Sequence, residues 1–441
     1  MENMNTARKN IILISFDDAI AFYKYKTVFN EPIRVPNLDR FCDESTIFQS
    51  AYCQSPICGP SRSSFMSAKT PHELGIFENS DNIFDKVAAK EIWSYSLKEN
   101  GYFCSSGGKV HHLYRPLRRR FHRVIYSDEQ KRFRSDMNLP ADVDKKKFGG
   151  HRRGLATLDQ ADDGNYYDHQ SANSAIKFLE EYDRSEPFYR EVGFYSPHGP
   201  HYTPARFKEM YDVRNLKKPE SWQNGYDKTA YSEENYPENI SEHGDRWWKR
   251  SIRNYFSAFS HGDYHFGRVL DALKASRHAE NTVVIILSDH GFHLGNKDRF
   301  KKTTLWEQVA SVPFIIHDPE RVTPREVDDP VALLDVGPTV LDYAGLAPPE
   351  NCVGRSLHPL LMGQADPDRV VPTFHHDDVS VRTGDYRLVR YRDGTTEFYN
   401  LKDDYWQLRN LGARHPAFAD AYAALVECSK TYGLDIDPSP P

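Results

Sequence analysis

Four short runs rich in β-branched and other apolar residues constrain the fold of this 441-residue chain most strongly. Runs of this length, bounded by turns, are typical of the buried strands of a parallel sheet. They lie at residues 11–16, 188–195, 283–287 and 312–316. Stretches in which apolar residues recur at helical spacing fall between them, at residues 91–100, at 169–182 and after Trp247. This alternation predicts a doubly wound α/β sandwich.

Two of the predicted strands end at acidic residues. Asp17 and Asp18 follow the first run directly, and Asp289 with His290 follows the third after one serine. Open α/β sheets bind ligands beyond the carboxyl ends of their strands, and adjacent carboxylates repel each other unless a cation lies between them. Three carboxylates and one imidazole therefore predict a divalent-metal site. The structural alternative makes Asp17 or Asp18 a helix cap or a turn residue.

The sequence changes character near its C-terminal end. From about Val371, short alternating segments turn at residues 383–385 and 393–394, which predicts a small antiparallel sheet, and a helix is expected over 416–430. We place a boundary near residue 365, between a catalytic α/β domain (1–365) and a C-terminal subdomain (366–441). Two charged, aromatic stretches, 115–163 and 211–247, are expected to form long surface loops around a cleft.

Composition excludes some classes of protein. The net charge of -6 argues against general nucleic-acid binding. A mean hydropathy of -0.70, without an apolar run near the ~20 residues that span a bilayer, argues against an integral membrane protein. The six cysteines are scattered and the N-terminal apolar run is short, which favours a cytoplasmic protein without a disulfide framework. A homo-oligomer remains possible.

A cysteine followed by Gly-Pro-Ser-Arg is the third chemical signal. Pro60 suits the first turn of a helix, which would leave Cys58 at a helix N-terminus, where the dipole favours an anion. Arg62 lies one helical turn further on and can face the same anion. Together these residues indicate a nucleophile beside a positive pocket. The alternative is a free cysteine in a loop.

Six ordered elements, spread over nearly the whole chain, resemble those of the type I sulfatases of the alkaline phosphatase superfamily. They are Asp17-Asp18, the C-x-P-S-R signature at 58–62, GKVHH at 108–112, PHGP at 197–200, SDHG at 288–291 and KTTLWE at 302–307. The SDHGFHLG segment looks closest to the iduronate-2-sulfatase-like branch. The resemblance implies an alkaline-phosphatase-like three-layer sandwich with a large mixed, mostly parallel sheet, plus a smaller C-terminal α+β subdomain with an antiparallel sheet.

The resemblance also implies a catalytic apparatus. The family converts the signature cysteine to formylglycine, and an oxygen of the modified Cys58 would join one divalent cation, calcium with magnesium or manganese as alternatives. The other ligands would be Asp17, Asp18, Asp289 and His290. The cation and Arg62 would stabilise the hydrated aldehyde that attacks sulfur, and Asp17 or Asp18 would accept its hydroxyl proton.

The remaining implied roles concern sulfate binding and proton transfer. Lys109 and Lys302 would neutralise the sulfuryl oxygens, and His198 or Lys302 would protonate the leaving alcohol. His111 would break down the sulfated intermediate as a base. Family members place this histidine two or three residues after the lysine, so His112 is the alternative. Taken singly, each of these residues could equally be a surface or loop residue.

The expected activity is hydrolysis of the sulfate ester of a small sulfated carbohydrate. The alternatives are a phosphodiesterase or phosphonate monoester hydrolase of the same superfamily, and a catalytically silent binding protein on this scaffold. A formylglycine-generating maturation enzyme is the expected partner, although residues 66–71 depart from the usual signature tail and make efficient modification less certain. Candidate substrate contacts, which could also be solvated surface, are His201, Tyr202, His375, His376, Arg118–Arg120 with Arg123, and the basic residues of 145–147 and 152–153.

Overall fold

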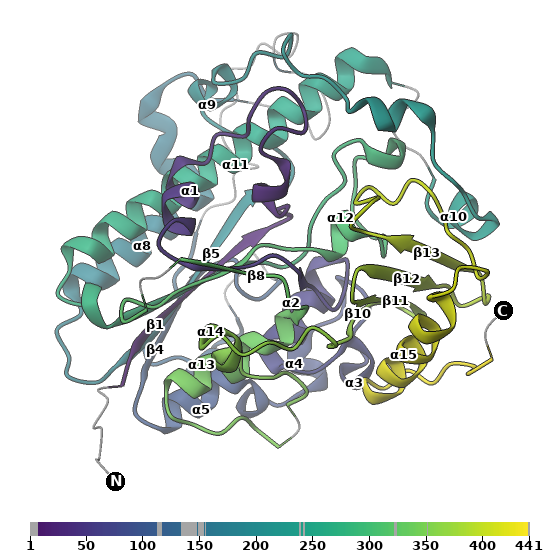
Figure 1. Ribbon diagram of the computed structural model, residues 1–441. Coiled ribbons are helices and arrows are strands. Elements are labelled where there is room, and N and C mark those ends of the chain that lie inside the picture. Colours follow the sequence, from purple (N-terminus) through teal and green to yellow (C-terminus); the bar gives the residue numbers. More distant parts are fainter. Residues whose placement is uncertain are drawn as a thin grey trace.

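A seven-stranded mixed sheet forms the centre of the molecule (Figure 1). The computed structural model describes residues 8–112, 117–133, 148, 154, 156–237, 240, 243–321, 324–350 and 352–439. The strand order is β4-β5-β1-β6-β7-β2-β8. The strands are β1 (Asn10–Asp17), β2 (Thr46–Phe48), β4 (Phe103–Gly108), β5 (Phe188–Pro197), β6 (Thr282–Ser288), β7 (Phe314–His317) and β8 (Arg325–Val327).

One strand runs against its neighbours. Strands β4, β5, β1 and β6 are mutually parallel, whereas β7 is antiparallel to both β6 and β2. The interpretation of 312–316 as a parallel strand was therefore wrong in direction. The reason is that the connection from β6 does not cross back to the opposite edge before β7 begins. A strand buried on both faces has the same apolar sequence in either direction.

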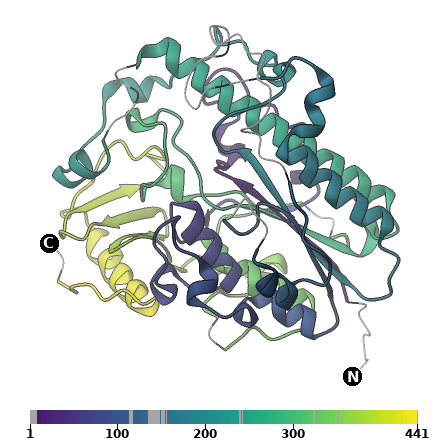
Figure 2. The same ribbon diagram turned by 180° about the vertical axis from the view of Figure 1, so that it is seen from behind.

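Two layers of helices cover the sheet. Alternate residues of β1 point to opposite faces: Ile11 and Leu13 belong to one buried cluster, and Ile12 and Ile14 to another. The first cluster includes residues of α2 (Cys58–Ser67), α5 (Trp93–Glu99) and α13 (Val336–Tyr343). The second includes residues of α1 (Pro36–Cys42), α8 (Tyr167–Glu181) and α11 (Gly244–Ala275). Figures 1 and 2 show these two sets on opposite sides of the sheet. The three-layer sandwich is thus confirmed.

The regions that were expected to be irregular contain short helices. The stretch 211–247 holds η6 (Glu220–Asn224), α10 (Ala230–Asn235) and the start of α11, so that prediction was wrong in part. A one- or two-turn helix shows too little periodicity to be recognised, and α10 is defined instead by the capping of its first turn by Thr229. The stretch 115–163 holds α6 (Arg119–Ile125) and the start of η5 (Gln160–Asn165). Within it, residues 115–116, 134–147, 149–153 and 155 lie outside the described residues.

The C-terminal sheet has the expected antiparallel order. Its strands are β10 (Val371–His375), β11 (Asp378–Thr383), β12 (Tyr386–Arg390) and β13 (Thr396–Asn400), and α15 (Phe418–Thr431) packs on it. The buried cluster under this sheet includes Tyr52, Ala310 and Leu334, so the sheet is packed directly against the larger part of the chain. Among the helices of the described residues, none is both long and apolar enough to cross a membrane.

Shorter elements complete the described chain. They are α3 (Pro71–Leu74), α4 (Ile83–Lys86), α9 (Ala205–Glu209), α12 (Glu307–Ala310), α14 (His358–Leu361), the β3 (Ala51–Tyr52) and β9 (Val331–Ala332) pair, and the 3-10 turns η1 (Phe22–Tyr25), η2 (Ala89–Glu91), η8 (Ala279–Asn281), η9 (Asn296–Asp298) and η10 (Leu333–Asp335).

A glycine contact positions the end of β4. Gly108 and Gly193 are neighbours in the β4–β5 register, and the Lys109 amide donates to the Gly193 carbonyl at 3.1 Å. A Cβ atom at Gly193 would overlap the Lys109 backbone. Glycine is therefore required at position 193 because the two backbones approach so closely.

We expect Gly193→Ala to lower the free energy of unfolding by about 1–3 kcal/mol, because the added methyl group must displace the Lys109 backbone. Urea denaturation followed by circular dichroism measures this change. Gly164→Ala is the matched control, since no atom lies within 4 Å of the added Cβ there. Equal stability of the two variants would contradict the close-approach argument.

Candidate active site

Four parallel strands deliver polar residues to one edge of the sheet. Asp17 is the last residue of β1, Asp289 follows β6, Lys109 follows β4, and His198 follows β5. The register pairs Asp17 with Pro197 and Phe16 with Ser288, so these strand ends lie side by side. This is the edge at which open α/β sheets bind their ligands.

The signature cysteine begins a helix that points into this edge. Cys58 is the first residue of α2, Ile57 before it is extended, and Pro60 lies in the first turn. The cysteine is 1% exposed. Its Sγ atom lies 3.5 Å from Asp17 Oδ1, 3.2 Å from His290 Nε2 and 2.8 Å from Lys302 Nζ. Burial raises the pKa of the Cys58 thiol, and the Asp17 carboxylate raises it further.

Carboxylate, imidazole and sulfur atoms gather here within the reach of a single ion. Ligand atoms of Asp17, Cys58, Asp289 and His290 all lie within 4.8 Å of one another, and Asp17 and Cys58 form a second such group with Asp18 and His198. Asp18 has a left-handed backbone (φ 62°), a conformation that aspartate tolerates better than most residues. The donor set fits a divalent cation that prefers oxygen ligands and accepts one imidazole.

The tautomer of His290 supports this fit. Its Nδ1 lies 2.9 Å from the Gly291 carbonyl oxygen, which can only accept, so Nδ1 carries the proton. Nε2 is then the ring nitrogen that faces Asp18 Oδ1, 3.4 Å away, and Cys58. Metal-binding histidines commonly have their second nitrogen fixed in this way.

Three cationic side chains surround the carboxylates. Arg62 Nε donates to Asp289 Oδ2 at 2.9 Å, Lys109 Nζ pairs with Asp17, and Lys302 Nζ donates to Asp18 Oδ1 at 2.7 Å. Burial alone would raise the pKa of the Asp18 carboxyl, but Lys302, His198 and His290 outweigh it and hold that pKa well below its usual range. The cationic neighbours lower the pKa of the Asp17 carboxyl as well, so Asp17 and Asp18 are both anions at neutral pH.

Arg62 also fixes the backbone of two strand ends. Its guanidinium donates to the Lys109 and Val110 carbonyl oxygens at 2.7 and 3.0 Å, and to the Phe16 carbonyl oxygen at 3.0 Å. The arginine, which is 1% exposed, thus ties α2 to the ends of β1 and β4.

The adjacent histidines of the GKVHH element have different surroundings. His111 Nε2 lies 3.1 Å from the Tyr126 hydroxyl, which donates to Glu191 Oε2 at 2.6 Å. Burial lowers the pKa of His112 to about 4, with further effects from Lys109, Asp17, Arg62 and Lys302. Those charges belong to the cluster around Cys58, so the His112 ring lies within its electrostatic reach. Burial and, after it, Arg62 also lower the pKa of His111, but the His111 ring is in addition held in a hydrogen-bonded network with two residues outside the cluster.

His198 presents one nitrogen to the cluster. The Tyr195 hydroxyl donates to the Gly199 carbonyl at 2.7 Å and accepts from His198 Nδ1 at 2.9 Å. Nε2 then faces Asp18 Oδ2, 3.9 Å away. This tyrosine was not recognised from the sequence.

The other candidate substrate contacts are dispersed. The His201 ring is 1% exposed and packs edge-to-face against Tyr255. His376 pairs with Glu78 at 2.9 Å and stacks on Phe77. His375 lies at the end of β10, and Tyr202 is half-buried. Arg118–Arg120 and Arg123 are exposed around α6. The basic residues of 145–147 and 152–153 lie outside the described residues.

Sequence reasoning assigned no role to the residues that support the cluster from behind. Tyr255 of α11 donates to the Asp18 carbonyl oxygen at 2.5 Å, and Ser61 and Ser288 hold the backbone of 289–290. Ser61 and Ser288 stand in the recognised C-x-P-S-R and SDHG motifs, which were their only signal. Glu191, which accepts from Tyr126 outside the cluster, was also missed, although it is an acidic residue inside the apolar run of a buried strand. Burial raises the pKa of Glu191 to about 7.

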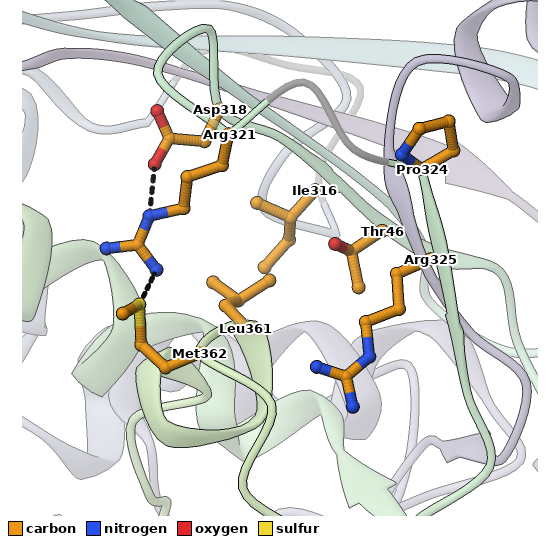
Figure 3. Close-up of a pocket in the computed structure, with 8 residues that line it drawn as sticks. All are labelled: Thr46, Ile316, Asp318, Arg321, Pro324, Arg325, Leu361 and Met362. Carbon is orange, nitrogen blue, oxygen red and sulfur yellow. Dashed lines mark hydrogen bonds and ion pairs between the residues drawn. The ribbon is translucent and has the colours of Figure 1, made fainter.

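A cavity of about 450 Å³ elsewhere in the molecule is not part of this site (Figure 3). It is lined by Thr46, at the start of β2, and by Asp318, just after β7. Since β7 runs antiparallel, both residues lie at the edge of the sheet opposite the Cys58 cluster. Arg321 in this cavity is already paired with Asp318 at 3.3 Å.

The amino-acid sequence of this chain is similar to those of known proteins. Residues 9–346 match the family described as Sulfatase, and residues 295–427 match the family described as N-sulphoglucosamine sulphohydrolase, C-terminal. A sulfatase of Formosa agariphila is 30% identical over 423 residues, covering 90% of this chain and 82% of that protein. Iduronate 2-sulfatase of Mus musculus is 29% identical over 415 residues, covering 81% and 72%. These matches confirm the resemblance inferred from the motifs.

Solved structures share the fold. A protein in complex with its substrate D-glucosamine-2-N,6-O-disulfate superimposes with a TM-score of 0.74 at 20% identity, covering 96% of this chain and 98% of that one. The phosphonate monoester hydrolase of Agrobacterium radiobacter gives a TM-score of 0.75 at 18% identity, covering 97% and 96%. These neighbours confirm the alkaline-phosphatase-like fold.

We expect Arg62→Met to lower the free energy of unfolding by about 3–5 kcal/mol in EDTA-treated protein, because Asp289 is left buried without its partner. Guanidinium titrations of the variant and the parent protein measure this loss. Arg214→Met is the control: its pair with Asp212 is at the surface, so no measurable change is expected. A stable Arg62→Met protein would show that Arg62 does not neutralise the cluster.

Proposed function

The chain belongs to the sulfatase family of sulfuric ester hydrolases, and we propose that it releases sulfate from a small sulfated carbohydrate through a formylglycine made from Cys58. The observation that carries the proposal is the position of Cys58. Its Sγ atom lies against carboxylates, an imidazole and a lysine ammonium in one buried cluster. An anionic ester group could be held there by cations while a nucleophile at position 58 reacts.

A divalent cation would be held by Asp17, Asp18, Asp289 and His290, together with an oxygen on the modified Cys58. Calcium is our first choice because oxygen ligands dominate, with magnesium or manganese as alternatives. When bound, the cation would supply Lewis-acid stabilisation, and formylglycine would supply a hydrated aldehyde as the nucleophile. The donor set and the tautomer of His290 support this proposal.

Lys109 and Lys302 would bind the sulfuryl oxygens. Both are buried, and their ammonium groups lie on Asp17 and Asp18 respectively. Lys302 also reaches the Cys58 Sγ atom, so its charge is placed where negative charge would develop. Fixed charges in a dry site stabilise such charge without solvent reorganisation.

Besides the hydroxyl proton that Asp17 or Asp18 would accept from the nucleophile, two protons must be moved during turnover. A poor alkoxide leaving group needs a proton, and His198 Nε2, in the imidazolium form of the ring, or Lys302 Nζ would deliver it because both atoms face the cluster. A base must then remove the hydroxyl proton from the sulfated residue to release sulfate. We assign this base to His112 rather than His111, since the His111 Nε2 atom is engaged with Tyr126.

The carbohydrate substrate is proposed from relatives. One relative is named for iduronate, and one structural neighbour was solved with a disulfated glucosamine. The exposed arginines around α6 would suit a carboxylate or a second sulfate of such a sugar. We also propose maturation by a formylglycine-generating enzyme and a cytoplasmic location, with which six free cysteines are compatible.

A second candidate is hydrolysis of a phosphodiester or phosphonate ester. The similarity to a phosphonate monoester hydrolase, with a TM-score of 0.75, favours it as the alternative. A silent binding protein is the third possibility, but the retained set of charged residues around Cys58 argues against it.

We expect at least a ~100-fold higher kcat/KM for an aryl sulfate than for the matched aryl phosphodiester, because in the proposed function the site binds and activates a single sulfuryl group. Steady-state kinetics with calcium would measure both. Mass spectrometry of the peptide containing Cys58 should detect the aldehyde, and Cys58→Ala should remove turnover. A preference for the phosphorus ester would support the second candidate, and a plain thiol without any turnover would support the silent scaffold.

The two histidines of GKVHH can be separated by substitution. We expect His112→Asn to lower kcat by about 10²–10⁴-fold, because a general base is lost. His111→Asn, the matched control, should reduce kcat by less than about tenfold if its ring only bonds Tyr126. Rapid-quench assays should show a burst of alcohol release in the His112 variant, and a burst in the His111 variant alone would reverse the assignment.

A further inference from the structure

Lys302 differs from most of the cluster in how it is held. Asp17, Lys109, His198 and Asp289 lie at or next to strand ends, whereas residues 299–306 contain no helix or strand. The backbone of this segment is bonded to other segments on both sides of Lys302: the His293 amide donates to the Lys301 carbonyl at 2.9 Å, and the Thr303 amide donates to the Pro56 carbonyl at 3.2 Å. The position of the Lys302 ammonium group must therefore depend on tertiary contacts.

Five residues earlier, a second lysine is buried among aromatic rings. Lys297 is 2% exposed, and its Nζ atom has no hydrogen-bond partner within the described residues. The atom lies 4.6, 4.4 and 5.2 Å from the ring centroids of Tyr226, Trp306 and Tyr399. Each distance is within the range of a cation–π interaction. Burial lowers the pKa of Lys297 to about 8.

A buried carboxylate orients two of these rings. Glu397 of β13 accepts hydrogen bonds from Trp306 Nε1 at 2.7 Å and from the Tyr399 hydroxyl at 2.9 Å. It also accepts from Thr229, the residue that caps α10, at 3.1 Å. Figures 1 and 2 both show α10 beside β13. Two of the three rings around Lys297, those of Trp306 and Tyr399, are therefore fixed to the C-terminal sheet.

The backbone at this lysine is strained. Lys297 and Asp298 have left-handed conformations with φ of 51° and 48°. Such conformations are costly for residues other than glycine and persist only where the surroundings enforce them. Trp306, four residues after Lys302, supplies one of the rings that surround Lys297. Lys302 therefore lies between two residues, Lys297 and Trp306, that contact each other.

We propose that Lys297, enclosed by the rings of Tyr226, Trp306 and Tyr399, is a positioning residue. Its cation–π contacts fix the 297–306 segment against the C-terminal sheet and so place the Lys302 ammonium group at Cys58. This inference rests on the proposed function, in which Lys302 binds the sulfuryl group. Through this contact the C-terminal sheet contributes to catalysis without touching the substrate.

Kinetics of a double-mutant cycle test the proposal. Lys297→Met keeps the length of the side chain but removes its charge, and it should lower kcat/KM for an aryl sulfate about tenfold. In a Lys302→Ala background the same substitution should have no further effect, because Lys297 acts through Lys302. Lys301→Met, at the exposed neighbouring lysine, is the control and should change kcat/KM less than twofold. Equal losses from Lys297→Met in both backgrounds would overturn the proposal.

Hydrogen exchange gives a readout that does not need activity. Amides of the 295–306 peptide should exchange about tenfold faster in Lys297→Met than in the parent protein. In Lys301→Met their exchange rates should equal those of the parent protein. If Lys297→Met does not fold, Tyr399→Leu removes one face of the cage and should give the same two results. Unchanged exchange in Lys297→Met would refute the positioning role of Lys297. Faster exchange in Lys297→Met, together with a parent protein that has no sulfatase activity, would refute the proposed function alone.

Discussion

The compensation of buried charge at the carboxyl edge of the central sheet is the constraint on which the rest of this structure depends. Asp17, Asp18 and Asp289 are almost inaccessible to water, and isolated carboxylates in such a place would be strongly destabilising. Arg62, Lys109 and Lys302 supply the opposite charges. In the proposed holoenzyme a cation would take over part of this role, which would free the two lysines to bind an anionic group. The same balance of charge would thus serve both folding and catalysis.

The segments that carry these residues are held by different means. Strand register sets Asp17, and the close approach of Gly193 to the Lys109 backbone sets the end of β4. Arg62 ties α2 to both strand ends through carbonyl oxygens. The position of Lys302 instead depends on a segment packed against the C-terminal sheet. There Glu397 and Lys297 both contact Trp306. The small sheet is therefore linked to the cluster around Cys58.

Much of the fold was predictable because its signals are local. The β1 and β6 runs, the helical spacing along α11 and the turns of the C-terminal sheet all recur in the structure at nearly the expected residues. The direction of β7 was not predictable, since its burial on both faces gives one apolar pattern for either direction. The short helix α10 was missed because a single capped turn has no measurable period.

The sequence by itself determined which chemical groups this protein has at its strand ends and in its signature helix, because motifs of a few residues and their order along the chain carry that information. Only the tertiary structure decided how those groups face one another. It separates His111 from His112 through the hydrogen bond of His111 to Tyr126. It also shows that His198 is oriented by Tyr195 and that Lys297 is enclosed by rings from three distant segments. Such contacts depend on side-chain direction and on packing between segments far apart in the chain, which no local pattern encodes.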